Sequence, residues 1–166
     1  MSRLENITLR NITPADLDTF YVQQLDPEAI RLAAFVSAAR RDKAAFLAHW
    51  DKILKSPENT NRTIVAGGQV AGHVACFPLH GDLNVTYWLG REFWGRGVAT
   101  EALRQLLQLV PTRPVFGAAA SDNHGSIRVL QKCGFKVIGK DKGFAEGRSA
   151  ETEEVILRLD TTQADG

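Results

Sequence analysis

The sequence predicts an α+β domain with about seven β-strands and about four helices. Three observations lead to this class. Apolar and polar residues alternate over residues 7–10, as in a half-buried strand, and two further strand-like runs flank residues 67–69, as in a hairpin. Another strand-like run, ending at Leu89, leads through a turn with two glycines directly into a helix. Strands and helices therefore alternate in blocks along the chain.

One domain is expected to account for nearly all of the sequence. A chain of 166 residues can bury a sizeable core, which we place in a single domain at residues 1–160, and a short flexible tail is expected at 161–166. Its two cysteines, Cys76 and Cys133, favour a reduced, cytoplasmic protein. The 20 basic residues nearly balance the 19 acidic ones, so neither nucleic acid nor a membrane surface is an expected partner.

The first half of the chain is expected to fold as one strand and two helices. After the strand at 7–10, Thr13 is a suitable N-cap residue and Pro14 a suitable first helical residue, so a helix should run to about Leu25. Residues 28–54 are mostly helix formers, with a break expected near residues 40–42.

The second half should contain the remaining strands and helices. Glycine and proline clusters separate these runs, and no repeat or low-complexity segment interrupts them. The expected strands are 62–66, 70–77, 83–89, 115–120, 135–140 and 153–159, and the expected helices are 98–110 and 126–133. The first three of these strands should be antiparallel.

The turn between residue 89 and the helix at 98 has the properties of a phosphate-binding turn. Gly95 and Gly97 let the backbone approach a ligand closely, and the first N–H groups of the following helix have no intrahelical partner. These donors and the helix dipole favour an anion. A P-loop would require Gly-Lys-Ser/Thr at the end of the turn, and a dinucleotide-binding turn would require glycine where Thr100 stands. The ligand is therefore expected to belong to another class of phosphate compound.

Two blocks of sequence carry a family resemblance. The first, WGRGVATEAL from Trp94, resembles the acetyl-CoA signature of the GNAT superfamily of N-acetyltransferases, except that Trp94 replaces Gln or Arg. The second, NHGSIRVLQKCGF from Asn123, resembles a helix of the same family that ends at Gly-Phe; Asn123 is a good N-cap, and Gly134 stands where a helix ends. The wording YWLG, from Tyr87, is similar to the branch that acetylates ribosomal-protein N-termini.

The resemblance implies a fold and a co-substrate. The fold is a single domain with a central mixed, mostly antiparallel, twisted sheet, and acetyl-CoA is the expected co-substrate, with no metal. The pantetheine arm would pair with the backbone of Tyr87, Trp88 and Leu89, and the Leu89 N–H would face the acetyl oxygen. The turn, the first helical residues and two residues of the second block would bind the rest of CoA: Trp94, Gly95, Arg96, Gly97, Val98, Ala99, Thr100, Asn123 and Ser126. Independently of the resemblance, Arg128 and Lys132 lie four apart on one face of the last helix and are expected to contact the 3′-phosphate of CoA, with a solvated basic face as the alternative.

The proton for the departing thiolate has an unusual candidate source. The tyrosine that serves many GNAT relatives falls on Leu130, so the resemblance leaves Ser126 as the candidate general acid, and a small residue that permits close approach of CoA is the alternative. No general base is assigned; Asp82, His80 and His73 remain candidates through water. An α-amine, with a reference pKa of about 8 against about 10.4 for lysine, needs a base less, which favours α-amines as acceptors.

Other reactive residues are assigned to structural roles. His73 and Cys76 point to opposite faces of one strand, and no fourth ligand lies near these two residues and His80, so a zinc site is not expected. Cys133 lies too far along its helix from His124 for a thiol nucleophile, and Glu101 is favoured by the helix dipole alone.

The function predicted from the sequence is acetyl transfer from the CoA thioester to a primary amine by direct attack in a ternary complex. The acceptor would be a protein N-terminal α-amine, with small amines or aminoglycosides as the alternative acceptor class. A CoA-binding regulatory module with weak catalysis is a third possibility, because the usual acid is missing. The assembly is expected to be a monomer or a homodimer.

Overall fold

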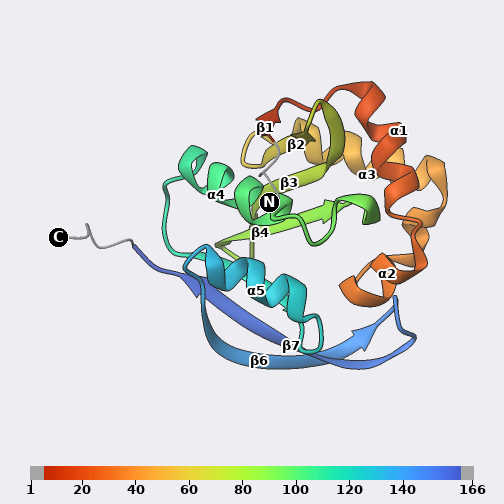
Figure 1. Cartoon of the computed structure of the whole chain (residues 1–166). Coiled ribbons are helices and arrows are strands. Elements are labelled where there is room, and N and C mark those ends of the chain that lie inside the picture. The colour runs from red at the N-terminus through yellow and green to blue at the C-terminus, as the bar shows by residue number, and fades with distance from the viewer. Residues whose placement is uncertain (1–5, 162–166) are drawn as a thin grey trace.

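The computed structural model describes residues 6–161, so the predicted tail lies, apart from Thr161, outside the described residues. It forms one seven-stranded sheet with helices on both faces (Figure 1). The strands are β1 (Ile7–Arg10), β2 (Thr60–Ala66), β3 (Gln69–Leu79), β4 (Asp82–Leu89), β5 (Val115–Ala120), β6 (Lys136–Ala145) and β7 (Ala150–Leu159). The helices are α1 (Pro14–Gln23), α2 (Pro27–Ala33), α3 (Lys43–Lys55), α4 (Val98–Leu109) and α5 (His124–Lys132), with short 3₁₀ turns η1 (Ala38–Arg41) and η2 (Arg91–Phe93).

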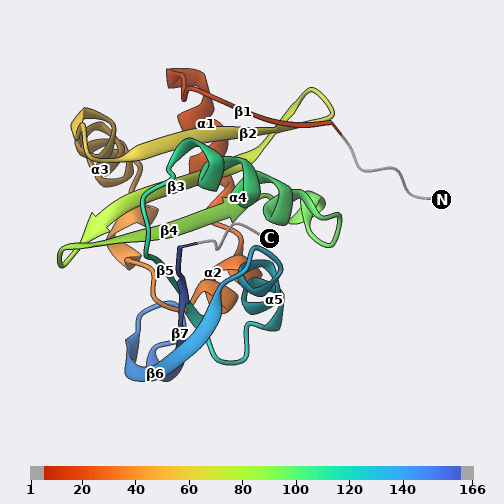
Figure 2. The same ribbon diagram turned by 90° about the vertical axis from the view of Figure 1, so that its left-hand side faces the viewer.

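The sheet opens between its two central strands. The strand order is β1-β2-β3-β4-β5-β7-β6, and every neighbouring pair is antiparallel except β4 and β5. These two strands are parallel and pair only at Leu83 with Val115 and at Asn84 with Phe116. Figure 2 shows them running apart beyond this point. The rest of β4 therefore has one edge that β5 does not use.

The two faces of the sheet bury separate clusters. α4 and α5 cover one face, and their apolar residues join the inward residues of the strands in the main core, in which Ile64, Leu103 and Leu157 are fully buried. α1 and α3 cover the other face, where Phe20, Phe46 and Trp50 form a smaller aromatic cluster. The predicted antiparallel hairpins and the mixed sheet are confirmed.

A buried carboxylate fixes α1 to the sheet. Thr13 and Pro14 start the helix as predicted, and Asp16 accepts hydrogen bonds from the Thr13 N–H at 2.9 Å and the Thr63 hydroxyl at 2.7 Å. The Arg10 guanidinium adds two more, at 2.7 and 2.9 Å. Burial by itself would raise the pKa of Asp16, but these donors outweigh it and hold the pKa well below its usual range.

The early helical region divides further than the sequence indicates. The break expected near residues 40–42 is longer, because α2 ends at Ala33 and α3 begins only at Lys43. Ala34 has a φ of 61°, in the left-handed region, which ends α2, and Asp42 caps α3 by accepting the Ala45 N–H at 2.9 Å. Residues 6–161 therefore contain five α-helices, against about four expected. None of the described helices is long and apolar enough to cross a membrane.

Candidate functional site

The predicted phosphate-binding turn connects β4 to α4. Gly95 and Gly97 have φ values of 72° and 75°, which glycine adopts without strain. Gly97 is the N-cap of α4 and gives the helix no side-chain hydrogen bond. The first N–H groups of α4 have no intrahelical partner, so they and the positive end of the helix dipole form a site that favours an anion.

Side chains around the turn fix its course. Trp94 Nε1 donates to the carbonyl oxygen of Leu89 at 3.2 Å, and Arg96 Nη1 donates to the carbonyl oxygen of Glu92 at 2.8 Å. The Arg96 guanidinium also lies 5.3 Å from the centre of the Phe93 ring. The tryptophan that departs from the general signature thus holds the turn against the end of β4.

α5 begins at the end of β5, on the other side of the opening in the sheet. Asn123 Oδ1 accepts the Ser126 N–H at 3.3 Å, which confirms the predicted N-cap, and Gly134, with a φ of 96°, follows the helix end. Asn123 Nδ2 also donates to the carbonyl oxygen of Leu32 at 3.2 Å. This bond ties the start of α5 to α2, and it leaves the second N–H of the carboxamide available to a ligand.

A hydrogen bond between β4 and α5 spans the opening. The Tyr87 hydroxyl lies 2.6 Å from Ser126 Oγ and 3.3 Å from the Ser126 carbonyl oxygen. Burial raises the pKa of Tyr87 to about 12, so the phenol stays protonated near neutral pH. From the sequence, only the backbone of Tyr87 is expected to have a role. The signal was present, because Tyr87 alternates with Val85 and Leu89 on the strand face that packs toward α4 and α5.

α2 and the turn between β6 and β7 form a wall beside the start of α5. The Gly147 N–H donates to the carbonyl oxygen of Ala34 at 2.8 Å, and Arg148 Nε donates to that of Arg31 at 2.7 Å. A Cβ on Gly147 would lie 2.6 Å from the Ile30 carbonyl oxygen, so this approach requires glycine. These contacts hold the β6–β7 turn close to α2.

A cavity of about 320 Å³ lies on this wall. Its lining residues are Phe35, Val36, Ser37, Arg40, Phe144 and Glu146. Phe35 and Phe144 are 39% and 66% exposed, and Glu146 accepts the Ala38 N–H at 3.2 Å. Exposed aromatic rings beside a carboxylate can contact an amine-bearing molecule. The sequence carries no motif for this cavity.

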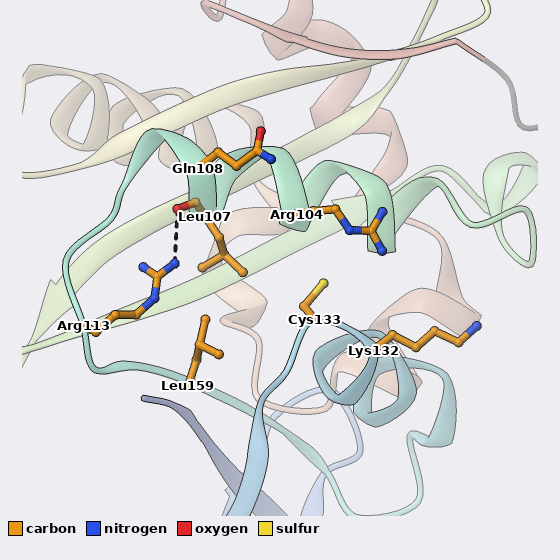
Figure 3. Close-up of a pocket in the computed structure, with 7 residues that line it drawn as sticks. All are labelled: Arg104, Leu107, Gln108, Arg113, Lys132, Cys133 and Leu159. Atoms are coloured by element: carbon orange, nitrogen blue, oxygen red, sulfur yellow. Dashed lines mark hydrogen bonds between the residues drawn. The ribbon is translucent and has the colours of Figure 1, made fainter. Parts of the chain in front are cut away.

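A second, basic cavity of about 230 Å³ lies between α4 and the end of α5 (Figure 3). Its lining residues are Arg104, Leu107, Gln108, Arg113, Lys132, Cys133 and Leu159. Of the two basic residues predicted to contact CoA, Lys132 borders this cavity, whereas Arg128 is an exposed residue of α5 outside its lining. Arg113 donates to the carbonyl oxygens of Val110 and Leu107 at 2.7 and 3.3 Å. The end of α4 therefore uses some of the N–H donors of the Arg113 guanidinium.

The histidine and the cysteine of β3 occupy structural positions. His73 lies 4.8 Å from both the Phe20 and the Trp50 ring centres, while Cys76 is buried in the main core on the other face and His80 is exposed. Burial lowers the pKa of His73 to about 4, and its Nδ1 has no hydrogen-bond partner. Within residues 6–161, no three His, Cys, Asp or Glu side chains are grouped to hold a metal ion.

Glu101 has partners within its own helix. It forms an ion pair with Arg104 and accepts Gln105 Nε2 at 3.0 Å. Its structural role, expected from the sequence, stays a prediction. Cys133 Sγ lies 3.5 Å from the carbonyl oxygen of Thr100, and burial raises the pKa of its thiol. A raised pKa opposes a nucleophilic thiolate.

Comparison with known proteins places the chain in a family. The model of the acetyltransferase (GNAT) domain matches residues 6–136. The chain belongs to the GNAT acetyltransferase family. A GNAT domain makes it an acyltransferase that uses acetyl-CoA as co-substrate. None of the curated proteins matches it in sequence.

Solved GNAT structures share its fold at low sequence identity. Mycobacterium smegmatis RimJ, in complex with CoA-disulfide, has a TM-score of 0.80 and 16% identity, over 96% of this chain and 84% of RimJ. RimL, a ribosomal L7/L12 alpha-N-protein acetyltransferase in complex with CoA, has a TM-score of 0.76 and 15% identity, over 94% and 96% of the two chains. Spermidine N-acetyltransferase from Vibrio cholerae, in complex with CoA and spermine, has a TM-score of 0.77 and 15% identity, over 93% and 95%.

Proposed function

We propose that this protein is a cytoplasmic enzyme that transfers the acetyl group of acetyl-CoA to a primary α-amine, in a ternary complex, as in N-terminal acetylation of a protein. The observation that carries the proposal is the opening between β4 and β5, which is bordered by the phosphate-binding turn on one side and the start of α5 on the other. An extended thioester can lie along the unused edge of β4 with its phosphates at α4.

The CoA-binding residues follow from this placement. The pantetheine arm pairs with the backbone of Tyr87, Trp88 and Leu89, and the free N–H of Asn123 contacts the arm or a water beside it. N–H groups from Gly95 to Thr100 bind the pyrophosphate, with the charge of Arg96 beside them.

The acetyl transfer needs few side chains. The amine attacks the carbonyl carbon of the thioester, and the Leu89 N–H stabilises the negative charge that develops on the carbonyl oxygen. The C–S bond then breaks with its electron pair on sulfur, and Ser126 provides the proton that converts the thiolate to CoA thiol. The proton that the amide nitrogen loses passes to water, and an equivalent proton returns to Ser126, so the serine is neutral for the next turnover.

The acceptor approaches from the wall formed by α2 and the β6–β7 turn. Glu146 offers a carboxylate to an ammonium group there, and Phe35 and Phe144 offer apolar contact. An α-amine has a reference pKa of about 8, so a useful fraction is neutral near pH 7 without a strong base. The likeness to RimL and RimJ is consistent with an N-terminal α-amine, and the likeness to spermidine N-acetyltransferase keeps small amines as the second acceptor class.

Release of CoA thiol from acetyl-CoA tests the proposal. The purified protein should be incubated with acetyl-CoA and, in separate reactions, with peptides bearing free α-amines, the same peptides with acetylated N-termini, polyamines and aminoglycosides. Thiol release that requires a free α-amine supports the proposal, and release only with polyamines or aminoglycosides supports the second acceptor class. CoA binding without release for any acceptor would instead support a CoA-binding regulatory module.

A further inference from the structure

We infer that Tyr87 is a positioning residue that acts through Ser126. The Tyr87 hydroxyl orients the Ser126 hydroxyl toward the departing sulfur and replaces the proton that Ser126 gives to sulfur. This inference rests on the proposed function. It begins from the 2.6 Å contact between the Tyr87 hydroxyl and Ser126 Oγ. The two residues are 39 positions apart and come from opposite sides of the opening in the sheet.

Serine alone is a poor source of a proton for sulfur. An alkoxide is a much stronger base than a thiolate, so Ser126 can protonate sulfur only if it regains a proton in the same event. Ser126 is the third residue of α5, and its own N–H is already bound to Asn123 Oδ1. The Tyr87 hydroxyl is the only side-chain hydroxyl, among the described residues, that forms a hydrogen bond with Ser126 Oγ.

The inference requires that the Tyr87 hydroxyl donate the hydrogen bond that it shares with Ser126 Oγ. Burial keeps the phenol protonated, so it can donate to Ser126 Oγ, and in the inferred arrangement it does so, which leaves the serine proton free to point at another acceptor. A donated hydrogen bond also polarises the serine hydroxyl and makes it a better donor. Because the Tyr87 ring packs against the main core, this geometry is held in place by the fold.

The proton transfers balance. As the C–S bond breaks, its electron pair remains on sulfur, the Ser126 proton moves to sulfur, and the Tyr87 proton moves to Ser126 Oγ. The proton that the amide nitrogen loses returns through water to the Tyr87 oxygen. Because a phenolate in this buried place is unfavourable, the transfer from Ser126 to sulfur and the transfer from Tyr87 to Ser126 occur together, and no free phenolate accumulates.

A buried tyrosine that simply satisfies its hydroxyl would show the same contact, so the test must separate the two roles. The variants are Tyr87→Phe, Ser126→Ala and the double variant, with Tyr21→Phe as a matched control. Tyr21 also donates its hydroxyl to another residue, the carbonyl oxygen of Arg41 at 2.5 Å, but it belongs to α1. Thermal unfolding of each variant shows whether the fold is retained.

Single-turnover rates with an accepted amine are the first measurement. Tyr87→Phe and Ser126→Ala should each lower the rate at least about tenfold, with acetyl-CoA affinity within about threefold, and the double variant should lose little more than either single one. In wild-type protein the solvent deuterium effect should indicate two protons in transfer, and in Tyr87→Phe only one. A Tyr87→Phe rate within about threefold of wild type, or losses that multiply in the double variant, would overturn the inference.

A second measurement needs no acceptor, so it distinguishes this inference from the proposed function. Free CoA is bound to the protein, and its thiol is titrated by the ultraviolet absorbance of the thiolate. The hydroxyl pair should lower the pKa of the bound thiol, and Tyr87→Phe or Ser126→Ala should raise it again, while Tyr21→Phe leaves it unchanged. A thiol pKa that is equal in wild type and Tyr87→Phe contradicts the inference, even if acetyl transfer itself is established.

Discussion

Arg148 forms two hydrogen bonds of 2.7 Å to the carboxylate of Asp122, which immediately precedes the N-cap of α5. Its Nε donates at the same time to the carbonyl oxygen of Arg31, at the end of α2. One side chain, 16% exposed, therefore joins the proposed acceptor wall to the helix that borders the CoA site. Arg148 gives the two proposed binding regions a shared support.

Arg148→Ala should lower both stability and acceptor use. Loss of the paired charge-assisted hydrogen bonds should cost about 1 to 2 kcal/mol of the free energy of unfolding. The KM for the acceptor should rise about fivefold or more, because the wall is no longer fixed. Urea unfolding and steady-state kinetics measure these effects. Lys142→Ala removes an ion pair of the same hairpin whose two side chains are 65% exposed, and it should change stability by less than about 0.5 kcal/mol.

Gly97→Val should weaken CoA binding about tenfold or more, which corresponds to about 1.4 kcal/mol. A side chain there obstructs the approach of phosphate to the turn, and it also strains a left-handed backbone with a φ of 75°. Gly81→Val is the control for strain, because Gly81 has a φ of 86° in the β3–β4 turn, where a Cβ would have no neighbour within 4 Å. Equal CoA affinities for the two variants, measured by calorimetry, would remove the phosphate assignment.

The double variant Arg128→Ala/Lys132→Ala should lose part of the preference for CoA over its 3′-dephospho analogue. The two residues are four positions apart on α5, and Lys132 borders the basic cavity together with Arg104. Affinity for CoA should fall about threefold to tenfold, with little change for the analogue. If both ligands weaken equally, the 3′-phosphate is bound elsewhere.

Asp16→Ala should destabilise the protein by about 2 to 4 kcal/mol, because the Thr63 hydroxyl stays buried without its partner and Arg10 loses its carboxylate. Asp18→Ala is a suitable comparison in the same helix. Asp18 is 71% exposed and pairs with Lys43 at 3.3 Å, so its loss should cost less than about 0.5 kcal/mol. Chemical denaturation gives both values.

The free energy of unfolding should decrease as the pH is lowered from about 6.5 to about 4, because of His73. The unfolded chain takes up a proton at the ordinary pKa of about 6.5, whereas burial lowers the pKa of His73 to about 4 in the folded protein. The unfolded state binds more protons in this range, so the free energy of unfolding decreases as pH falls, by about 1 to 3 kcal/mol in all.

Denaturation at several pH values checks this effect. His73→Phe should weaken the pH dependence, since phenylalanine fits between Phe20 and Trp50 and carries no proton. Burial and the positive charges of Arg40 and Lys52 lower the pKa of His49 to about 4 as well, so His49→Gln should remove a separate share. An unchanged pH dependence in His73→Phe would show that its ring is solvated in the folded state.

Local sequence signals predicted most elements because their causes are local. The strands β1 and β5 have the predicted bounds, and the start of α4 at Val98 and the cap at Asn123 follow from turn and capping chemistry. The path of residues 34–42 was not predictable, since it depends on Ala34 adopting a left-handed conformation where Gly147 meets it. That contact joins residues more than a hundred positions apart.

In the candidate site, too, local features could be predicted from the sequence and nonlocal contacts could not. The turn at Gly95 and Gly97 is a contiguous motif, so the sequence reveals it. The Tyr87–Ser126 contact and the support by Arg148 depend on how strands and helices pack, and no spacing along the chain encodes them. The cavity lined by Phe35 and Phe144 joins α2 to the β6–β7 turn in the same nonlocal way.

The two-pair junction between β4 and β5 has a further consequence for cohesion. Leu83 and Asn84 supply the backbone pairing between a half-sheet of β1 to β4 and a half-sheet of β5 to β7, and α4 and α5 add the side-chain contacts across the boundary. A molecule that fills the opening touches both half-sheets, so part of its binding energy holds the protein together. With acetyl-CoA in the opening, as proposed, the enzyme should therefore be more stable to unfolding than the same enzyme without its co-substrate.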